Sequence, residues 1–439
     1  MKAKSFAVIG LGQFGMTLAR ELANADYDVL AIDDKDENIQ EIAETVTYAV
    51  RADVREPDIL KSLGVQNVDV AIVEAAAVNA DGSIVLGPGV GNIPMFVKHA
   101  KKVIVEVNTT IPLNMEGMHD IYICAKPPHR TEIPIYHVGD RIGSPYLECG
   151  LDKIACIVES DIVDHVRNLN PPDENSIKIA GFLVEFLEHE QKYGRLPQEM
   201  LPIQSGVGSI ANAVLMGLSQ SKYENLKMYS EILQDAVFSL IKIGKVSQAS
   251  GCAFTPSPNV WQMYKENPDL YRKSIVLRPL DISNNPEIIR RLGVISINTP
   301  LEFDIYGQAN STHVMGASMM NGIGGSGDYM RNGYLTIFCT PSTAKKGSIS
   351  SVVPMVTHAD HTEHDTMVFI TEQGIADIRG LSPVKRAKLI IEKCAHPDYK
   401  AQLLEYLQQA QRKNAHMPVD LMHAFDMQAH YEKYGTMKI

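Results

Sequence analysis

The chain has 439 residues, enough for two or three domains, and its 45% hydrophobic and 21% charged content is ordinary for a globular protein. Asp and Glu number 52 against 41 Lys and Arg, which gives a formal net charge of -11. This balance argues against a nucleic-acid-binding or anionic-membrane surface, because either partner requires a basic face.

The sequence predicts a cytoplasmic protein without membrane insertion. No charged-then-apolar leader opens the chain, and no apolar run approaches the roughly 20 residues that a membrane-spanning helix requires. The six cysteines are scattered and form no C-x-x-C pair. We interpret them as reduced thiols, mostly buried, as is usual in the cytoplasm.

A nucleotide-binding pattern opens the chain. An apolar strand is predicted at residues 6–9, a helix at 16–23 and a second strand at 28–32. The turn between the first strand and the helix has the spacing G-x-G-x-x-G, and an aspartate ends the second strand. This combination is the βαβ fingerprint of dinucleotide-binding domains.

Each residue of this fingerprint has a physical role. Gly10 makes the turn, Gly12 lets the backbone approach a pyrophosphate, and Gly15 lets the helix pack closely on the strand. Asp33 can accept hydrogen bonds from a pair of ribose hydroxyls. The alternative interpretation is a glycine-rich turn that binds no ligand.

Residues 4–73 as a whole, including YAVRADVREPDILKSLGVQNVDVAIV, resemble the N-terminal half of the regulator of potassium conductance (RCK) family. The resemblance implies a site for NAD(H) or for ATP or ADP, with Asp53 near the adenosine. It also implies a potassium-channel partner. One function open to this sequence is therefore a nucleotide-sensing regulatory module fused to an enzyme remnant.

A β-branched run at residues 68–73 predicts one buried strand, and from about residue 71 to residue 439 the resemblance changes. The chain now resembles the acetyl-CoA hydrolase/transferase family, closest to its succinyl-CoA:acetate CoA-transferase type. The resemblance implies a homodimer that moves CoA between an acyl-CoA, such as acetyl-CoA or succinyl-CoA, and a small carboxylate. Five motifs carry it, in this order: VIVEVNTTIPLNMEGMHDIYI, LPIQSGVGSIANAVLMGL, MYSEILQDAVFSLI, NGIGGSGDYMRNGYLTIF and HTEHDTMVFITEQGIADIRGLSP.

The third motif places Glu231 between a strand and a predicted helix. The carboxylate should then lie at the carboxyl edge of a parallel sheet, where open α/β folds bind ligands. On position alone a helix-capping acid is the stronger alternative, but the resemblance identifies Glu231 as the family's nucleophile. The apolar side of the predicted helix consists of Ile232, Leu233, Val237, Leu240 and Ile241.

In the family mechanism this glutamate attacks the thioester carbonyl of an acyl-CoA, and CoA returns to the resulting anhydride to form a glutamyl-CoA thioester. The acceptor carboxylate then reverses these steps. Backbone N–H groups are natural donors for the oxyanion, and in the loop NGIGGSGD the resemblance favours Gly325 for a catalytic role. The other glycines expected to contact CoA or the acyl group are Gly322, Gly324 and Gly327.

The resemblance implies further site residues. Asn284 matches a catalytic amide, although a helix N-cap explains it nearly as well, and Glu372 matches an acid near the active-site mouth. For the glycines of QSGVGS, a role in packing alone is as good an explanation as a role in binding. In GPGVGN, the Ser or Thr that the family usually has before Val-Gly-Asn is missing. The candidates for CoA or substrate binding in these two turns are Gly206, Gly208, Gly91 and Asn92.

Three histidines of THADHTEHD, namely His358, His361 and His364, are spaced three residues apart. Such a run can suggest a metal site. Three-residue steps rotate around a helix, however, and no further metal-ligand motif accompanies them. We predict no metal site.

These observations predict an α/β fold with open, mostly parallel sheets and flanking helices, in which a Rossmann-like segment is joined to a two-domain class I CoA-transferase-like fold. The expected domains are residues 1–73, 74–220 and 221–439. RCK-like sequence replaces the family's N-terminal portion, which helps to place the carboxylate. We therefore expect an abnormal N-terminal sheet, and either CoA transfer or, where water reaches the anhydride, slow acyl-CoA hydrolysis.

Overall fold

A computed structural model of the chain describes residues 5–9, 11, 13–33, 36–51, 70–125, 128–163, 172–255 and 257–439. The chain divides into two compact units. Unit 1 comprises Met1–Arg167, Glu231–Leu233 and Gln248–Asn285. Unit 2 comprises Asn168–Ser230, Gln234–Ser247 and Pro286–Ile439. Within the described ranges, no helix combines the length and apolarity needed to cross a membrane.

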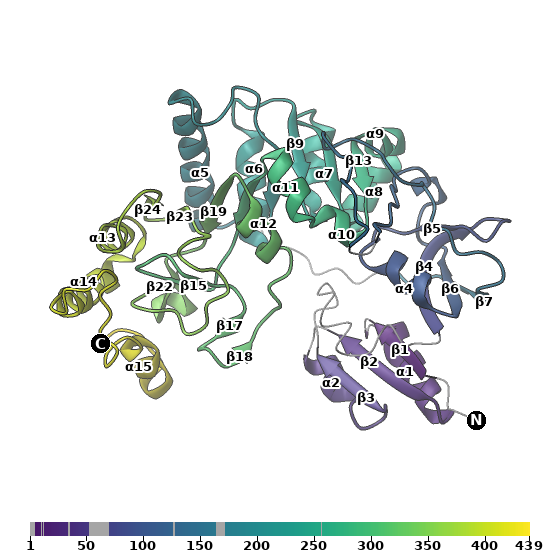
Figure 1. Cartoon of the computed structure of the whole chain (residues 1–439), viewed down its shortest axis with the longest axis horizontal. Helices are drawn as coiled ribbons and strands as arrows, with labels where there is room; N and C mark the ends of the chain where they lie inside the picture. The colour runs from purple at the N-terminus through teal and green to yellow at the C-terminus, as the bar shows by residue number, and fades with distance from the viewer. Residues whose placement is uncertain are drawn as a thin grey trace. The chain divides into compact units, whose positions relative to one another are not determined.

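The main sheet of unit 1 has the strand order β3-β2-β1-β4-β6-β7 (Figure 1), with neighbours paired in parallel. Strand β5 pairs with β4 in antiparallel fashion. The strands are β1 (Ser5–Ile9), β2 (Asp28–Asp33), β3 (Tyr48–Arg51), β4 (Val70–Val78), β5 (Ile84–Leu86), β6 (Lys102–Asn108) and β7 (Ile154–Ser160). The helices of this part are α1 (Gln13–Asn24), α2 (Asp36–Ile42) and α4 (Ile93–His99).

The predicted strand, helix and second strand at the start of the chain are confirmed as β1, α1 and β2. They are held together by a small apolar core in which Ala19 of α1 and Val29 of β2 are fully buried. The predicted strand at residues 68–73 is confirmed in its described part, as the beginning of β4. Strand β4 shares one residue pair with β1, Phe6 with Val70, and six with β6.

Strand β7 at the edge of this sheet exposes both of its faces. Its burial pattern shows no alternation, and Ile157 is 52% exposed. An exposed apolar edge strand is a general aggregation hazard.

The rest of unit 1 contains two short strand pairings and a buried ion pair. Strand β11 (Val246–Gly251) pairs with β13 (Ile275–Leu277), and β10 (Ile232–Leu233) pairs with β12 (Ala253–Phe254), both in parallel. The helices are α8 (Pro258–Glu266), α9 (Pro268–Ser274) and α10 (Leu280–Ser283). After β13, the fully buried guanidinium of Arg278 forms an ion pair with Asp120.

The segment around His119 is fixed against β13 by backbone hydrogen bonds. Leu277 donates to the carbonyl of Met118 at 2.9 Å, and Asp120 donates to the carbonyl of Leu277 at 2.8 Å. The buried ring of His119 lies with Nε2 2.9 Å from the carbonyl oxygen of Gly87. Because only an N–H can bond to that carbonyl, Nε2 carries the proton, and burial lowers the pKa of His119 to about 4.

We expect His119 to make the protein sensitive to acid. The unfolded chain takes up a proton at this residue near pH 6.5 and the folded chain only near pH 4, so stability falls as the pH drops below about 6.5. At pH 5 the loss should be about 2 kcal/mol. The variant His119→Gln keeps an N–H for Gly87 but cannot titrate. The free energy of unfolding, measured with urea at pH 7 and at pH 5, should therefore fall more in wild type than in this variant. Equal losses in the two proteins would contradict the assignment.

Unit 2 contains a second sheet, with strands in the order β9-β8-β14-β19-β23-β24. Its pairs are parallel where their registers are given, except for the antiparallel hairpin β23-β24. The strands are β8 (Ile203–Ser205), β9 (Leu226–Tyr229), β14 (Ile295–Asn298), β19 (Leu335–Cys339), β23 (Val368–Thr371) and β24 (Gly374–Asp377). This mixture of parallel sheets and helices in both units confirms the predicted α/β class.

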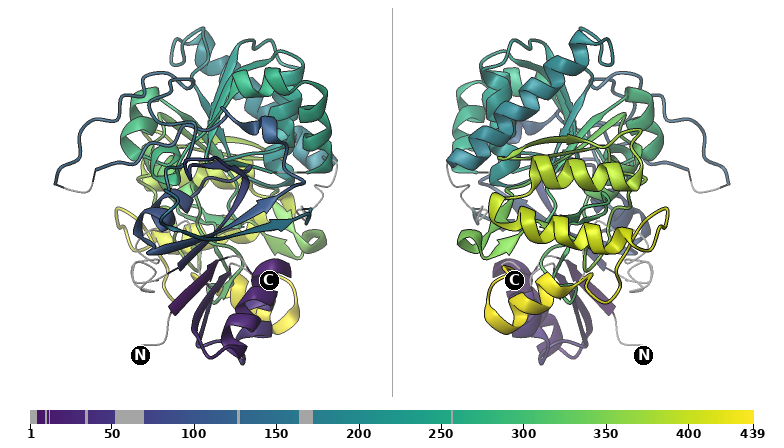
Figure 2. Two further views of the ribbon diagram at one scale, coloured as in Figure 1. Left: turned by 90° about the vertical axis from the view of Figure 1, so that its right-hand side faces the viewer. Right: turned by 90° about the vertical axis from the view of Figure 1, so that its left-hand side faces the viewer.

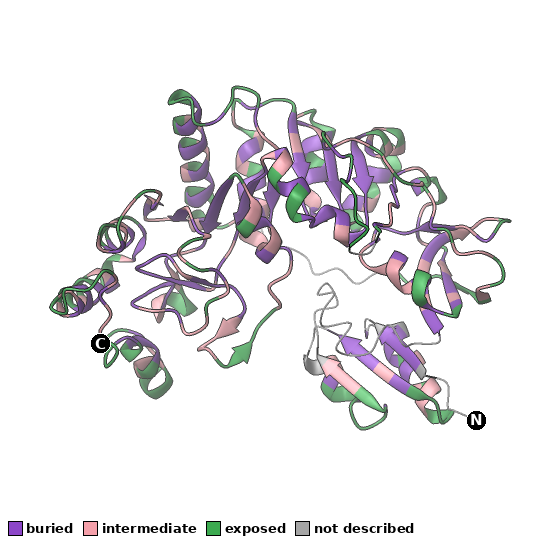
Figure 3. Cartoon of the chain, viewed as in Figure 1, coloured by how far each residue is buried: buried purple, intermediate pink, exposed green. Residues whose placement is uncertain are grey.

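The helices of unit 2 bury one side each. Along α5 buried residues recur between exposed ones (Figure 3), and Asp173 caps its N-terminus by accepting from Ser176 N–H at 2.8 Å. Helices α13 and α14 lie side by side (Figure 2) over a core that includes the stacked rings of Phe303 and Phe369. The helices are α5 (Glu174–Lys192), α6 (Ser209–Ser219), α7 (Asp235–Lys242), α11 (Pro286–Leu292), α12 (Ser326–Asn332), α13 (Pro383–Cys394), α14 (Pro397–Gln411) and α15 (Asp426–Tyr434).

One predicted helix begins later than expected. The sequence predicts Ile232 and Leu233 on the apolar side of a helix, but they form strand β10, and α7 begins at Asp235. Their backbone pairs in parallel with Ala253 and Phe254 of β12. Pairing with a segment about 20 residues away outweighed the local helical periodicity, which cannot register such a partner.

Candidate active site

In unit 1 the structure brings two predicted catalytic residues together. Glu231 directly precedes β10 and is only 6% exposed. The side-chain amide of Asn284 donates from Nδ2 to Glu231 Oε2 at 3.0 Å, across 53 positions of sequence. A buried carboxylate that accepts a hydrogen bond from an amide is both partly desolvated and oriented, as a nucleophile requires.

The local structure rules out both capping alternatives. Helix α7 begins at Asp235 with Gln234 at its N-cap, so Glu231 is not a helix-capping acid. Asn284 follows the end of α10 and lies at its C-cap. Its side chain donates to a carboxylate, whereas an N-cap side chain would accept from the backbone.

The amide of Asn284 is oriented by a neighbour that the sequence did not indicate. The hydroxyl of Ser283, which is fully buried, donates to Asn284 Oδ1 at 2.8 Å. With its oxygen accepting from Ser283, the amide must present its nitrogen to Glu231. Ser283 is therefore a positioning residue for Asn284.

The GPGVGN loop packs against the strand next to Glu231. Cys252 N–H donates to the carbonyl of Glu231 at 2.8 Å, and the carbonyl of Cys252 accepts from Val90 N–H at 2.8 Å and Gly91 N–H at 3.3 Å. Gly91 has φ +45°, and a Cβ there or at Gly89 would meet open space. The structure thus places Gly91, followed by Asn92, one strand away from Glu231.

In unit 2 the turn between β8 and α6 is held by Gln234, a residue that no sequence pattern indicated. Its side chain donates to the carbonyl of Gly206 at 2.9 Å and accepts from Gly208 N–H at 2.8 Å. Gly208 has φ +115°, and a Cβ at Gly206 would lie 3.0 Å from Asn298 Oδ1. Backbone geometry and packing therefore explain both glycines, and their contact with a substrate stays a prediction.

The glycine loop before α12 is tightly built. Gly324 has φ +54°, and a Cβ at Gly327 would lie 3.2 Å from Ile323 Cδ1. Gly325 is buried at the N-cap position of α12, and Gly322 begins the loop. The packing of Ile323 on the loop leaves no room for a side chain at Gly327 without a shift.

Glu372 lies in the turn between β23 and β24, where its carboxylate is bound by the chain itself. Its Oε2 accepts from Ser342 N–H at 2.7 Å, and the buried hydroxyl of Ser342 donates to Oε1. The structure thus holds this carboxylate in one orientation. Its place near an active-site mouth stays a prediction.

The three histidines of THADHTEHD do not converge. His361 is buried, the side chain of His358 is 40% exposed beside Asp360, and that of His364 is 82% exposed. In the part of the chain that the structure describes, no group of three or more His, Cys, Asp or Glu side chains is arranged to hold a metal ion.

The predicted nucleotide site falls partly outside the described residues, which exclude Gly10, Gly12 and Asp53. Gly15 lies buried in α1. The carboxylate of Asp33 is buried and already accepts from Leu11 N–H at 2.5 Å and from Asn38 Nδ2 at 3.1 Å. Nucleotide binding there stays a prediction.

Comparison with known proteins gives consistent matches. Two family models match: the acetyl-CoA hydrolase/transferase N-terminal domain over residues 36–168 and the corresponding C-terminal domain over residues 261–407. The chain is 52% identical over 375 residues to the succinyl-CoA:acetate CoA-transferase of Clostridium kluyveri, covering 85% of this chain and 70% of that protein. It is 45% identical over 403 residues to the propanoyl-CoA:succinate CoA transferase of Escherichia coli, covering 92% and 79%. It is 48% identical over 381 residues to the acetyl-CoA hydrolase of Schizosaccharomyces pombe, covering 85% and 73%.

Solved structures show the same fold. The match to RipA from Yersinia pestis has a TM-score of 0.69 at 21% identity and covers 94% of both chains. The match to 4-hydroxybutyrate CoA-transferase from Porphyromonas gingivalis has a TM-score of 0.66 at 21% identity and covers 93% of this chain and 94% of that one. These matches leave only 6–7% of this chain uncovered, which is fewer than 73 residues. The shared fold therefore includes part of residues 1–73.

None of these similar proteins is named as a potassium-transport regulator. The N-terminal family model begins at residue 36, inside the segment that we likened to the RCK family. The RCK resemblance therefore receives no support from these comparisons.

Proposed function

Because the chain belongs to the acetyl-CoA hydrolase/transferase family, we propose that it moves CoA between an acyl-CoA and a small carboxylate through a covalent intermediate on Glu231. The observation that carries the proposal is the buried pair of Glu231 and Asn284, with Asn284 Nδ2 3.0 Å from Glu231 Oε2. Acetyl-CoA and succinyl-CoA are the acyl donors that we expect, since two of the similar proteins are named for acetyl-CoA hydrolysis and for succinyl-CoA:acetate transfer.

In the proposed reaction a carboxylate oxygen of Glu231 forms a bond to the acyl carbon, and the carbon–sulfur bond breaks to release CoA thiolate. The thiolate then attacks the Glu231 carbonyl of the anhydride, which forms the glutamyl-CoA thioester and releases the acyl group as a carboxylate. A second carboxylate reverses both steps. Since one thioester is consumed and another is formed, the overall exchange has no large free-energy change, although the anhydride between them is higher in energy.

Other residues take supporting roles in this proposal. Asn284 orients the Glu231 carboxylate before attack, and Gly325 donates its backbone N–H to the oxyanion. Glu372 is the fourth catalytic residue of the proposal, near the active-site mouth. The residues that contribute to the binding of CoA or the carboxylate are Gly91, Asn92 and the glycines at 206, 208, 322, 324 and 327. Where water replaces the acceptor carboxylate, the same intermediate gives acyl-CoA hydrolysis.

Three further expectations belong to this proposal. They are a cytoplasmic location, a homodimer, and a nucleotide at the N-terminal segment, either NAD(H) or ATP/ADP. No observation favours potassium-channel regulation as a second function, and the carboxylate of Asp33 is already engaged by its own chain.

Trapping the intermediate tests the proposal. After incubation with acetyl-CoA, hydroxylamine should convert Glu231 to a hydroxamate, or borohydride should reduce it to an alcohol. Trypsin should release residues 228–242 with that modification, which fragment masses assign to Glu231. The variant Glu231→Gln serves as the unlabelled control. An unmodified peptide from wild-type protein that consumes acetyl-CoA would refute the covalent mechanism.

A further inference from the structure

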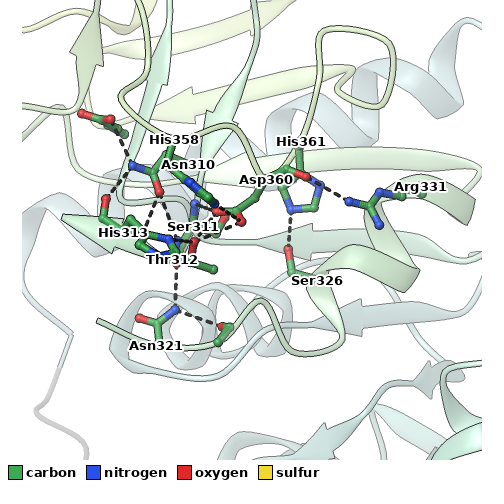
Figure 4. A network of polar contacts seen from close by, with 12 residues as sticks. Asn310, Ser311, Thr312, His313, Asn321, Ser326, Arg331, His358, Asp360 and His361 are labelled. Atoms are coloured by element: carbon green, nitrogen blue, oxygen red, sulfur yellow. Dashed lines mark hydrogen bonds and ion pairs between the residues drawn. The ribbon is translucent and has the colours of Figure 1, made fainter. Parts of the chain in front are cut away.

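A serine and a buried histidine form a hydrogen-bonded pair beside the glycine loop of unit 2 (Figure 4). Ser326 directly follows Gly325, and its Oγ lies 3.0 Å from Nε2 of His361. His361 is fully buried, whereas Ser326 is only partly buried. The pair joins residues 35 positions apart, so sequence spacing did not reveal it.

The ring of His361 is held in place from several sides. The backbone of His361 is fixed by two hydrogen bonds: Ala309 N–H donates to the His361 carbonyl at 2.9 Å, and the backbone N–H of His361 donates to the Ala309 carbonyl at 3.0 Å. The ring of Phe338 contacts the imidazole at a centroid distance of 5.1 Å. The preceding Asp360 accepts from the hydroxyl of Thr312 at 2.9 Å (Figure 4). The imidazole therefore has one orientation.

The surroundings of the ring determine which nitrogen carries its proton. Burial, and then the charge of Arg331, lower the pKa of His361 to about 4, so the ring is neutral near pH 7. Its Nδ1 is buried without a hydrogen-bond partner. An orphaned N–H is rarer in buried sites than an under-satisfied acceptor. The proton therefore resides on Nε2, and this N–H donates to Ser326 Oγ.

This arrangement leaves the hydroxyl proton of Ser326 available. Its oxygen accepts from His361, and within the described residues the structure provides that proton with no acceptor. A hydroxyl has one proton to donate, and because Ser326 is only partly buried, a group outside the chain can reach it. The hydroxyl is thus prepared to donate to an acceptor oxygen that comes from outside the chain.

We propose that Ser326 is a substrate-contacting residue, whose hydroxyl donates to the carbonyl oxygen of the acyl group bound beside the glycine loop. His361 is the positioning residue that holds this hydroxyl. The inference rests on the proposed CoA-transfer function, because in that reaction the acyl group brings such an oxygen to Gly325. It adds a side-chain donor to the backbone donor expected from Gly325.

The test compares Ser326→Ala with two amide variants of His361. The amide nitrogen of Gln can take the place of Nε2, whereas that of Asn can take only the place of Nδ1. We expect Ser326→Ala and His361→Asn each to lower kcat for acetyl-CoA:succinate transfer by at least about 10-fold. Loss of a full oxyanion donor typically lowers kcat by about 10²–10³-fold. His361→Gln should stay within about 3-fold of wild type. The double variant Ser326→Ala/His361→Asn should be no slower than Ser326→Ala, since both remove one interaction.

A binding measurement separates the inference from the function on which it rests. Calorimetric titration with acetyl-CoA should show weaker binding to Ser326→Ala than to wild type. If wild type gives no labelled Glu231 but this difference in affinity persists, the covalent mechanism fails and the contact stands. Unchanged kcat and unchanged affinity in Ser326→Ala would overturn the contact. Equal losses in His361→Gln and His361→Asn would overturn the role of the Nε2 proton.

Discussion

The variant Glu231→Gln is expected to transfer CoA at least about 10³ times more slowly than wild type, with little change in stability. Glutamine has nearly the same shape and can still accept a hydrogen bond from Asn284, so the buried pair persists. Its amide, however, is not a nucleophile, and no anhydride can form. Initial rates of succinyl-CoA formation from acetyl-CoA and succinate measure the effect.

The control for this variant is Glu224→Gln, which removes a carboxylate only seven positions earlier in the chain. Glu224 is exposed and pairs with Lys245 at the surface, where such pairs contribute little. Its transfer rate should stay within about 2-fold of wild type, since the charge lies in water. If Glu231→Gln keeps a tenth or more of the wild-type rate, the nucleophile is another group.

The variant Asp120→Ala is expected to destabilise unit 1 by about 3–5 kcal/mol, because it removes a carboxylate that is paired with the fully buried charge of Arg278. The guanidinium also donates to Ser250 Oγ at 2.8 Å and to the carbonyls of Val138 and Asp140. These neutral acceptors orient the charge but do not balance it.

The second oxygen of Asp120 adds to the expected loss. Its Oδ1 accepts from Ile142 N–H at 2.9 Å and from Gly143 N–H at 2.6 Å, and both donors lose their partner in the alanine variant. For a unit of roughly 200 residues, the predicted loss corresponds to a fall in Tm of about 6–20 °C. Differential scanning calorimetry measures it.

The matched control for this second variant is Asp269→Ala. Asp269 pairs with Arg272 at 3.4 Å in the same unit, but its side chain is 88% exposed. Its removal should change stability by less than about 1 kcal/mol. If both variants lower Tm equally, the burial of the Asp120–Arg278 pair does not increase the cost of removing its carboxylate, which would contradict the prediction.

Local patterns predicted much of the fold. The two strands and the helix at the start of the chain appear where the apolar runs and the helical periodicity placed them. The family resemblance pointed to Glu231 and Asn284 as expected catalytic residues, although position alone favoured capping for the first and allowed it for the second. The prediction failed at Ile232 and Leu233, where two apolar residues fit a helix and a strand equally well and only the partner strand β12 decides.

The sequence by itself determined the α/β class, the family and the identity of the expected nucleophile, because these depend on residue type and order along the chain. Only the tertiary structure decided what orients that nucleophile: the amide of Asn284 and, behind it, the hydroxyl of Ser283. The same holds for Gln234 on its glycine turn and for His361 on Ser326. Hydrogen bonds form between atoms about 3 Å apart in space, and separations of 53 and 35 residues along the chain carry no trace of that proximity.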